Sequence, residues 1–272
     1  MTWQGAFFGA VLGLLLTHSL YGVLLGAFIG QMLAQGLGGA APSSTSPGAV
    51  PEVFFRATFT FMGHIAKADG RVSESEIQAA RQLMQELKLE AEQVGFAIGF
   101  FSQGKSPGFD ADGMLEELRA ACGPRHDLMR VFVELQLRAA ILGSGATGLA
   151  HTILARTAGK LGRSGWEFVH MEAVLRAQYQ RRSRGGSGAG AGGGGTIYTR
   201  PSNLESAYQE LEVPSSATDA EVKKAYRRQM SRHHPDKLVA NGLPESMAEV
   251  AKEKTQRIQE AYETICAARG IK

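Results

Sequence analysis

Hydrophobic residues predominate in one long uncharged run near the N-terminus and recur at helical spacing in the rest of the chain. Residues 5–34 contain no Asp, Glu, Lys or Arg. About 20 apolar residues are enough for a helix to cross the core of a bilayer. The run therefore predicts a transmembrane helix at residues 5–34, behind a short N-terminus at residues 1–4. A secretory signal is the alternative, because Gly39-Ala40-Ala41 could imitate its cleavage site, although the positive N-terminal region of such a signal is missing.

Glycines are spaced regularly within this apolar run. Four residues make just over one helical turn, so glycines four apart form a groove where a second backbone can approach. Glycine is also common in membrane helices that stay single, and that interpretation remains open. The pattern favours self-association of the predicted membrane helix into a homodimer through two triplets, Gly5, Gly9 and Gly13, and then Gly22, Gly26 and Gly30.

A larger helical region follows a short tether of Gly, Ala, Ser and Pro at residues 35–50. Apolar residues in residues 51–182 recur three and four apart, as in an amphipathic helix. The stretch from Ser73 to Glu76 has the form of a capping box, which marks the start of a helix. We expect an all-α bundle of about six or seven helices with no strand.

A second helical module is expected at residues 203–272. Residues 183–202 are rich in Gly, Ser and Ala, which predicts a flexible linker that frees this module from the bundle's orientation. Within the module we expect helices near residues 204–211, from the capping box at Thr218 onward, and at residues 246–268. The last two should pack as an antiparallel pair joined by a long loop at residues 233–244.

The composition is ordinary for a globular protein and therefore excludes few classes of function. Apolar residues make up 44% of the chain and charged residues 20%. The net charge of +3 is too small to indicate nucleic-acid binding. Cys122 and Cys266 supply neither a disulfide framework nor metal-ligand spacing, which fits a reducing compartment.

The candidate chemistry lies in the predicted loop and on the helix before it. His234, Pro235 and Asp236 follow a stripe of cations made by Lys223, Lys224, Arg227 and Arg228. Taken alone, the stripe could be a solvated face or a patch for nucleic acid or lipid. The His and Asp residues, with His233, could suggest a metal site or acid-base catalysis, but no fourth ligand, nucleophile or pocket accompanies them.

Four landmarks in this module resemble the J domain in order and spacing: Ala207-Tyr208-Gln209-Glu210-Leu211, Ala225-Tyr226-Arg227-Arg228, His234-Pro235-Asp236-Lys237 and Gln259-Glu260-Ala261-Tyr262. The resemblance implies a co-chaperone, not an enzyme, that binds a DnaK-type ATP-driven chaperone. It also implies that the cationic face docks on the chaperone and that the His-Pro-Asp motif triggers ATP hydrolysis. No cofactor is implied for this chain, because the partner binds the ATP.

The order of the parts is similar to that of the membrane-anchored DnaJ-like co-chaperones of Gram-negative bacteria. Phe61-Met62-Gly63-His64, Gly70-Arg71-Val72 and the long loop carry the likeness. It implies a single-pass protein of the bacterial inner membrane, with a periplasmic N-terminus and cytoplasmic C-terminal domains. Charge alone favours this orientation only slightly. The client proteins remain open.

The central bundle resembles the tellurite-resistance TerB-like domains. The stretch from Ala68 to Glu76 has the acidic form associated there with metal binding, so Asp69 and Glu76 are candidate ligands. Two carboxylates cannot supply the six or more oxygens that a hard cation prefers, and we expect no metal. The alternative function is a membrane-tethered adaptor for stress signalling, in which the central domain binds clients or metal.

Overall fold

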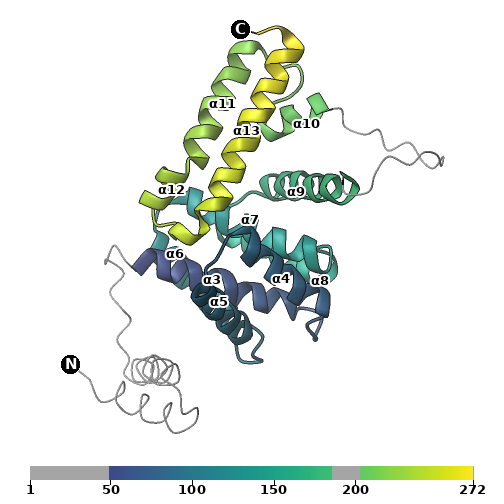
Figure 1. Ribbon diagram of the computed structural model, residues 1–272. Helices are drawn as coiled ribbons and strands as arrows, with labels where there is room; N and C mark the ends of the chain where they lie inside the picture. The colour runs from purple at the N-terminus through teal and green to yellow at the C-terminus, as the bar shows by residue number, and fades with distance from the viewer. Residues whose placement is uncertain (1–48, 186–202, 272) are drawn as a thin grey trace, which may run out of the picture. The chain divides into compact units, whose positions relative to one another are not determined.

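The computed structural model describes residues 49–185 and 203–271, and every regular element in these two stretches is helical. The predicted all-α class is therefore confirmed for them. The first stretch holds a bundle, shown in purple to teal in Figure 1. Its helices are α3 (Ala49–Ala66), α4 (Glu74–Glu86), α5 (Ala91–Gly104), α6 (Ala111–Cys122), α7 (His126–Gly143), α8 (Gly148–Lys160) and α9 (Gly165–Gly185).

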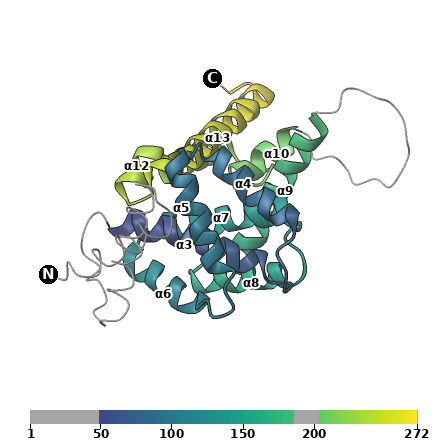
Figure 2. The ribbon, with the colours of Figure 1, turned by 60° about the horizontal axis from the view of Figure 1, so that its bottom comes forward.

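Helix α7 is the central element of the bundle. In Figure 2 it lies in the middle of the helices α3, α4 and α8, and it also packs on α9. Its side chains are buried on nearly every side, including the polar residues Glu134, Gln136 and Arg138. The Gln136 side chain donates a hydrogen bond of 3.0 Å to the carbonyl oxygen of Thr58. Such a partner offsets part of the cost of burying a polar group.

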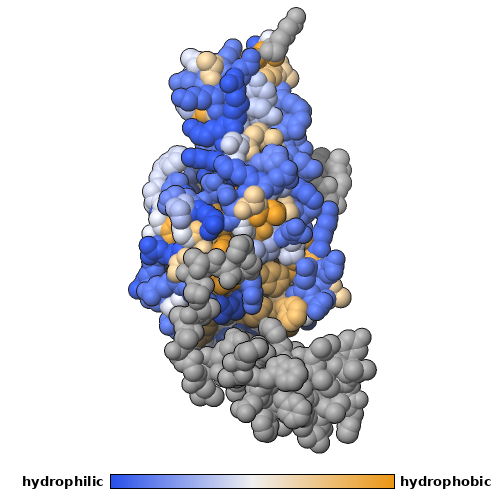
Figure 3. All heavy atoms as spheres, turned by 90° about the vertical axis from the view of Figure 1, so that its left-hand side faces the viewer, coloured by the Kyte–Doolittle hydropathy of each residue, from blue (hydrophilic) through white to orange (hydrophobic). Residues whose placement is uncertain are grey.

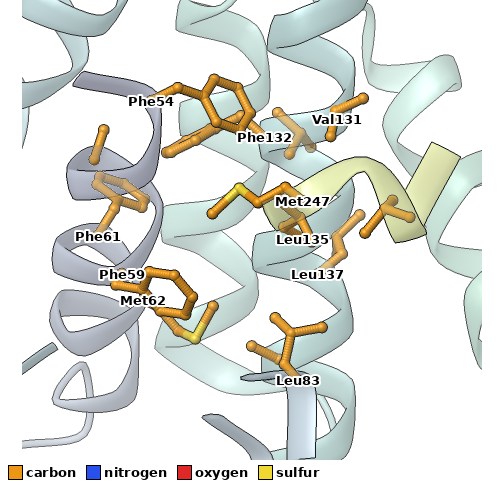
Figure 4. Close-up of a cluster of buried hydrophobic side chains, with 14 of the residues drawn as sticks. Phe54, Phe59, Phe61, Met62, Leu83, Val131, Phe132, Leu135, Leu137 and Met247 are labelled. Atoms are coloured by element: carbon orange, nitrogen blue, oxygen red, sulfur yellow. The ribbon is translucent and has the colours of Figure 1, made fainter. Parts of the chain in front are cut away.

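Aromatic packing joins α7 to α3. The rings of Phe54 and Phe132 lie edge to face, with centroids 6.2 Å apart, and both side chains are fully buried. Edge-to-face contact is a favoured arrangement because the positive edge of one ring meets the negative face of the other. Figure 4 shows these rings at one end of the core, with Phe59 and Phe61 further along α3.

Helices α3 and α5 approach so closely that two positions admit only glycine. A Cβ atom on Gly63 would lie 2.0 Å from the carbonyl oxygen of Phe101, and one on Gly104 would lie 1.7 Å from that of Thr60. Neither backbone oxygen can move without shifting a helix. These two glycines therefore set the spacing of the helix pair.

The two predicted capping boxes are present. Ser73 accepts a hydrogen bond from the backbone of Glu76 at the start of α4, and the Glu76 carboxylate accepts one from the backbone of Ser73. Thr218 and Glu221 make the same reciprocal pair at the start of α11 (Asp219–His233). Each box satisfies two backbone N–H groups that the first helical turn leaves without partners.

The C-terminal module contains α10 (Asn203–Glu210), α11, α12 (Pro235–Ala240), the short 3-10 turn η1 (Glu245–Met247) and α13 (Ala248–Arg269). Helices α11 and α13 form the predicted antiparallel pair (Figure 1). Helices α10, α11 and α13 share a buried apolar core that consists of Ala207, Tyr208, Leu211, Ala217, Val222, Ala225, Ile258, Ala261 and Ile265. The expected long loop differs, because six of its residues form α12.

The module is not free of the bundle, contrary to the expectation from the glycine-rich segment. Leu238, Leu243 and Met247 belong to the same buried cluster as the α3 and α7 side chains. Figure 4 shows Met247 beside Leu135 of α7. The composition of a linker indicates that it is flexible. Whether the bundle and the C-terminal module separate depends on the apolar residues that they bury together.

The predicted membrane helix at residues 5–34 lies outside the described residues, as do most of the tether and most of the linker. The tether is predicted to end at residue 50, but its last two residues, Ala49 and Val50, already belong to α3, and Val50 is buried in the core. Among the helices at residues 49–185 and 203–271, none is long and apolar enough to cross a membrane.

Candidate functional site

The His-Pro-Asp motif lies where the chain bends between α11 and α12. His234 has extended backbone angles, with φ of −61° and ψ of 125°, and it ends α11 and begins α12. Steric contact with the ring of Pro235 pushes the preceding residue out of the helical region. Proline suits the first position of a helix, where its missing N–H is not needed. The sequence His-Pro thus places a fixed bend at this point.

The side chains of the motif face solvent. The side chain of His234 is 51% exposed and that of Asp236 is 90% exposed. Nδ1 of His234 lies 3.9 Å from Oδ2 of Asp236, which is too long for a hydrogen bond. Both polar side chains therefore retain hydrogen-bonding capacity for another protein.

A cationic face leads along α11 to the motif. Lys224, Arg227 and Arg228 are exposed and Lys223 is half-buried. In Figure 3, which faces the side of Figure 1 where α11 lies, the surface of this module is mainly hydrophilic. The predicted stripe is thus a solvent-facing surface on the helix that ends at the motif. A surface of this charge steers an acidic partner and sets its register.

His233 differs completely from its neighbour His234. Only 3% of His233 is exposed, and its Nε2 atom has no hydrogen-bond partner. Burial, together with the nearby cations Lys254 and Arg130, lowers the pKa of His233 to about 3, although Glu134 and Glu212 oppose that shift. The imidazole is therefore neutral at physiological pH. Among the described residues, it belongs to no group of three or more His, Cys, Asp or Glu side chains that could hold a metal ion.

Buried charges on α7 connect the bundle to α13. Arg138 donates hydrogen bonds to Glu134, at 2.9 Å, and to Glu253 of α13, at 3.1 Å. Arg257 of α13 lies 3.8 Å from Glu134. Burial alone would raise the pKa of Glu134, but Arg138, Lys254 and Arg257 outweigh burial and hold that pKa well below its usual value. The carboxylate is charged, and the two parts of the chain neutralise it together.

A second pair of buried contacts extends this network toward α10. Arg130 of α7 donates to Glu212, which follows α10, and Lys254 of α13 donates to Glu210 at a distance of 2.7 Å. Burial opposes ionisation of Glu212, yet Arg130 lowers the pKa of this carboxyl to about 2. The pattern of apolar residues predicts none of these contacts, because Arg138 and Glu134 look like the polar face of an ordinary helix.

Apolar contacts fix the segment that follows the motif. Leu238, on α12, is fully buried, and its backbone N–H donates to the carbonyl oxygen of His234 at 3.0 Å. Gly242 has φ of +106°, and a Cβ atom there would lie 2.6 Å from Cγ1 of Val50 and 3.8 Å from Cδ1 of Leu128. The chain after His234 therefore lies directly against α3 and α7.

The candidate metal ligands do not converge in the structure. Glu76 is engaged in the capping box of α4, and Asp69 is exposed in the turn after α3. In the part of the chain that the structure describes, no group of three or more His, Cys, Asp or Glu side chains could hold a metal ion. The six glycines predicted to drive self-association lie outside the described residues.

Comparison with known proteins matches both helical regions to families. Residues 206–269 match the DnaJ domain, and residues 55–136 match the tellurite resistance protein TerB. No solved structure matches the chain.

Similar proteins cover the full length of the chain. It is 39% identical to "Co-chaperone protein DjlA" of Coxiella burnetii and 38% identical to the protein of that name in Yersinia pestis, each over 100% of both chains. A protein of the same name in Haemophilus ducreyi is 44% identical over 81% of this chain and 80% of its own. This chain is therefore a J-domain co-chaperone of the DjlA family, with a TerB-like bundle before its J domain.

Proposed function

We propose that this chain binds a DnaK-type chaperone through the cationic face of α11 and stimulates its ATP hydrolysis through the His-Pro-Asp motif. The observation that carries the proposal is the exposure of His234 and Asp236 at a fixed bend, directly after the exposed cations of α11. The chain itself binds no nucleotide in this proposal, and the partner performs the hydrolysis.

The physical basis is a shift in the partner's conformational equilibrium. The cations bring an acidic chaperone surface into register. His234 and Asp236 then make hydrogen bonds that are better in one chaperone conformation than in the other. A protein that binds one conformation more tightly moves the equilibrium toward it, and hydrolysis speeds up when that conformation is the active one.

Anchoring to the bacterial inner membrane is part of the same proposal. The uncharged apolar run at residues 5–34 would span the bilayer once, with residues 1–4 in the periplasm and the helical domains in the cytoplasm. A cytoplasmic J domain would meet a chaperone that is supplied with ATP. The tandem glycine triplets in this run would allow two copies to pair.

The substitution His234→Gln tests the proposed function. Glutamine keeps the polarity and approximate length of the side chain but removes the imidazole, so we expect stimulation of DnaK's ATPase to fall to the basal rate. The measurement is steady-state ATP hydrolysis by DnaK with increasing amounts of the full-length chain. The matched control is His126→Gln, an exposed histidine at the start of α7, which should stimulate like the unmodified chain. Undiminished stimulation by a folded His234→Gln variant refutes the proposal.

A further inference from the structure

The bundle holds the chain on both sides of the His-Pro-Asp motif. His233, one residue before it, is buried among charges that include Arg130 and Glu134 of α7. Leu238, two residues after it, is buried in the apolar cluster that α3 and α7 build. Between these two fixed points His234, Asp236 and Lys237 are exposed, and Pro235 is partly exposed. Neither anchor belongs to the core that α10, α11 and α13 share.

The link between the bundle and the motif runs through the backbone. The N–H of Leu238 donates to the carbonyl oxygen of His234 at 3.0 Å, which closes the first turn of α12. Leu243 and Met247 continue the buried segment, and both are no more than 1% exposed. Removal of these side chains from the bundle would leave the six-residue α12 with only its packing on α11 and α13. Helices this short are not stable without tertiary contacts.

Charge contacts act at the same interface. Arg130 pairs with Glu212, and Arg138 pairs with Glu253, so α7 is tied to the chain after α10 and to α13. Lys88, in the turn after α4, pairs with Glu249 at the start of α13, at 2.9 Å. This last pair lies at the surface and contributes little energy by itself, but it marks a place where the two parts can be bridged chemically.

We propose that the TerB-like bundle is a positioning element for the His-Pro-Asp motif, acting through the burial of Leu238, Leu243 and Met247. This inference rests on the proposed function. The docked arrangement is the one that engages the chaperone, because it leaves His234, Asp236 and the cations of α11 exposed. A released J domain keeps its own core, but its motif adopts the productive geometry for only a fraction of the time.

The fraction of molecules whose motif has the productive geometry determines the apparent affinity for the chaperone. When only part of a population is competent to bind, the apparent affinity falls by that fraction. Release of the segment should therefore raise the concentration of this chain at which stimulation is half-maximal. Maximal stimulation at saturation should change much less, because the chaperone selects the competent form.

The releasing substitution is Met247→Asp in the full-length chain, studied in detergent. Met247 is fully buried against the bundle but lies outside the core of the J domain, and it is too far along the chain to touch the partner as part of the motif. The matched control is Ser246→Asp, which puts the same charge at the neighbouring, partly exposed position. We expect Met247→Asp to raise the half-saturating concentration roughly tenfold, as for a competent fraction of about one tenth, and Ser246→Asp to leave it unchanged.

A locking variant tests the opposite direction. In a Cys266→Ser background, Lys88→Cys and Glu249→Cys are joined by a short bis-maleimide, which ties α4 to α13 in the docked arrangement. We expect the locked chain to stimulate DnaK as well as the same chain before cross-linking. We also expect the cross-link to rescue the Met247→Asp variant. Its half-saturating concentration should return toward that of the unmodified protein when the chain is locked, which would not happen if the substitution had damaged folding.

Two results of the ATPase assay overturn the positioning role: equal half-saturating concentrations for Met247→Asp and Ser246→Asp, or loss of stimulation when the chain is locked. Hydrogen exchange at the amide of Leu238 reads the docking without any chaperone. It should be slow in the unmodified chain and faster in Met247→Asp, and equal exchange in the two also overturns the inference. Failure of the unmodified chain to stimulate DnaK contradicts the proposed function instead, so the two failures are distinguishable.

Discussion

The substitution Leu238→Ala distinguishes a J domain that shares the bundle's core from one that is attached only by a linker. Leu238 is on α12, has no exposed surface, and packs in the cluster built by α3 and α7. A module that moved freely from the bundle would not bury this side chain against α3 and α7 and would leave it much more exposed. Its truncation would then change the free energy of unfolding by only a few tenths of a kcal/mol, as is usual for surface positions.

The shared core predicts a much larger cost. Leucine to alanine removes roughly three carbon groups, and each buried CH₂ is worth about 0.8 kcal/mol, so the transfer contribution is about 2 kcal/mol. The cavity left behind adds to this, and fully buried leucines typically cost about 2–5 kcal/mol on truncation. Because α12 is short and can settle partly into the space, we expect a loss of about 3 kcal/mol.

Urea unfolding of the compact unit Thr45–Lys272 measures this cost. The variant should unfold at a lower midpoint with little change in the dependence of the free energy on urea. Val239→Ala is the matched control, because Val239 is the next residue on the same helix and is only partly buried. A loss below about 1 kcal/mol for Leu238→Ala, or equal losses for the two variants, is incompatible with a shared core.

Two further predictions concern the bundle and the interface. Gly104→Ala should destabilise the fold by about 1–3 kcal/mol, since its Cβ would meet the carbonyl oxygen of Thr60. Gly99→Ala, on the exposed side of α5 where nothing lies within 4 Å, should instead stabilise the fold by about 0.5–1 kcal/mol. Thermal unfolding measures both effects, and similar effects of the two substitutions would contradict the close approach of α3 and α5. His233 has a pKa of about 3 in the folded state, against a usual value of 6.5. Between these two pH values the unfolded state binds a proton at His233 and the folded state does not. The free energy of unfolding should therefore fall as the pH drops from 6.5 toward 3, by at most about 1.4 kcal/mol per pH unit from this group. Urea unfolding at several pH values between 5 and 7 should show a shallower dependence in His233→Gln, and an unchanged dependence would show that His233 is not buried as described.

The local elements of this fold could be predicted because their signals are local. Ser73 with Glu76, and Thr218 with Glu221, mark helix starts through residues three apart, and both marks are correct. The bend at His234 also follows from its neighbour, since proline restricts the residue before it. The exposed cations and the buried apolar positions of α11 follow from helical periodicity.

The interface could not be predicted because its signals lie on different elements. Glu134 and Arg138 are four residues apart, which is typical of a solvent-exposed ion pair. Only the presence of Glu253 and Arg257 from α13 makes this pair a buried network. Likewise, Leu238 looked like one apolar residue in a loop, and nothing near it in the chain indicates that α3 and α7 supply its surroundings.

The central place of α7 makes the two domains thermodynamically dependent on each other. One side of this helix completes the bundle, and another receives the buried segment from η1 and its charged neighbours on α13. Coupling of this kind is reciprocal: a partner that binds more tightly to the docked J domain must, to the same extent, strengthen the seven-helix bundle beneath it. The resistance of the bundle to heat or proteases would then measure the fraction of molecules whose J domain is bound to a partner.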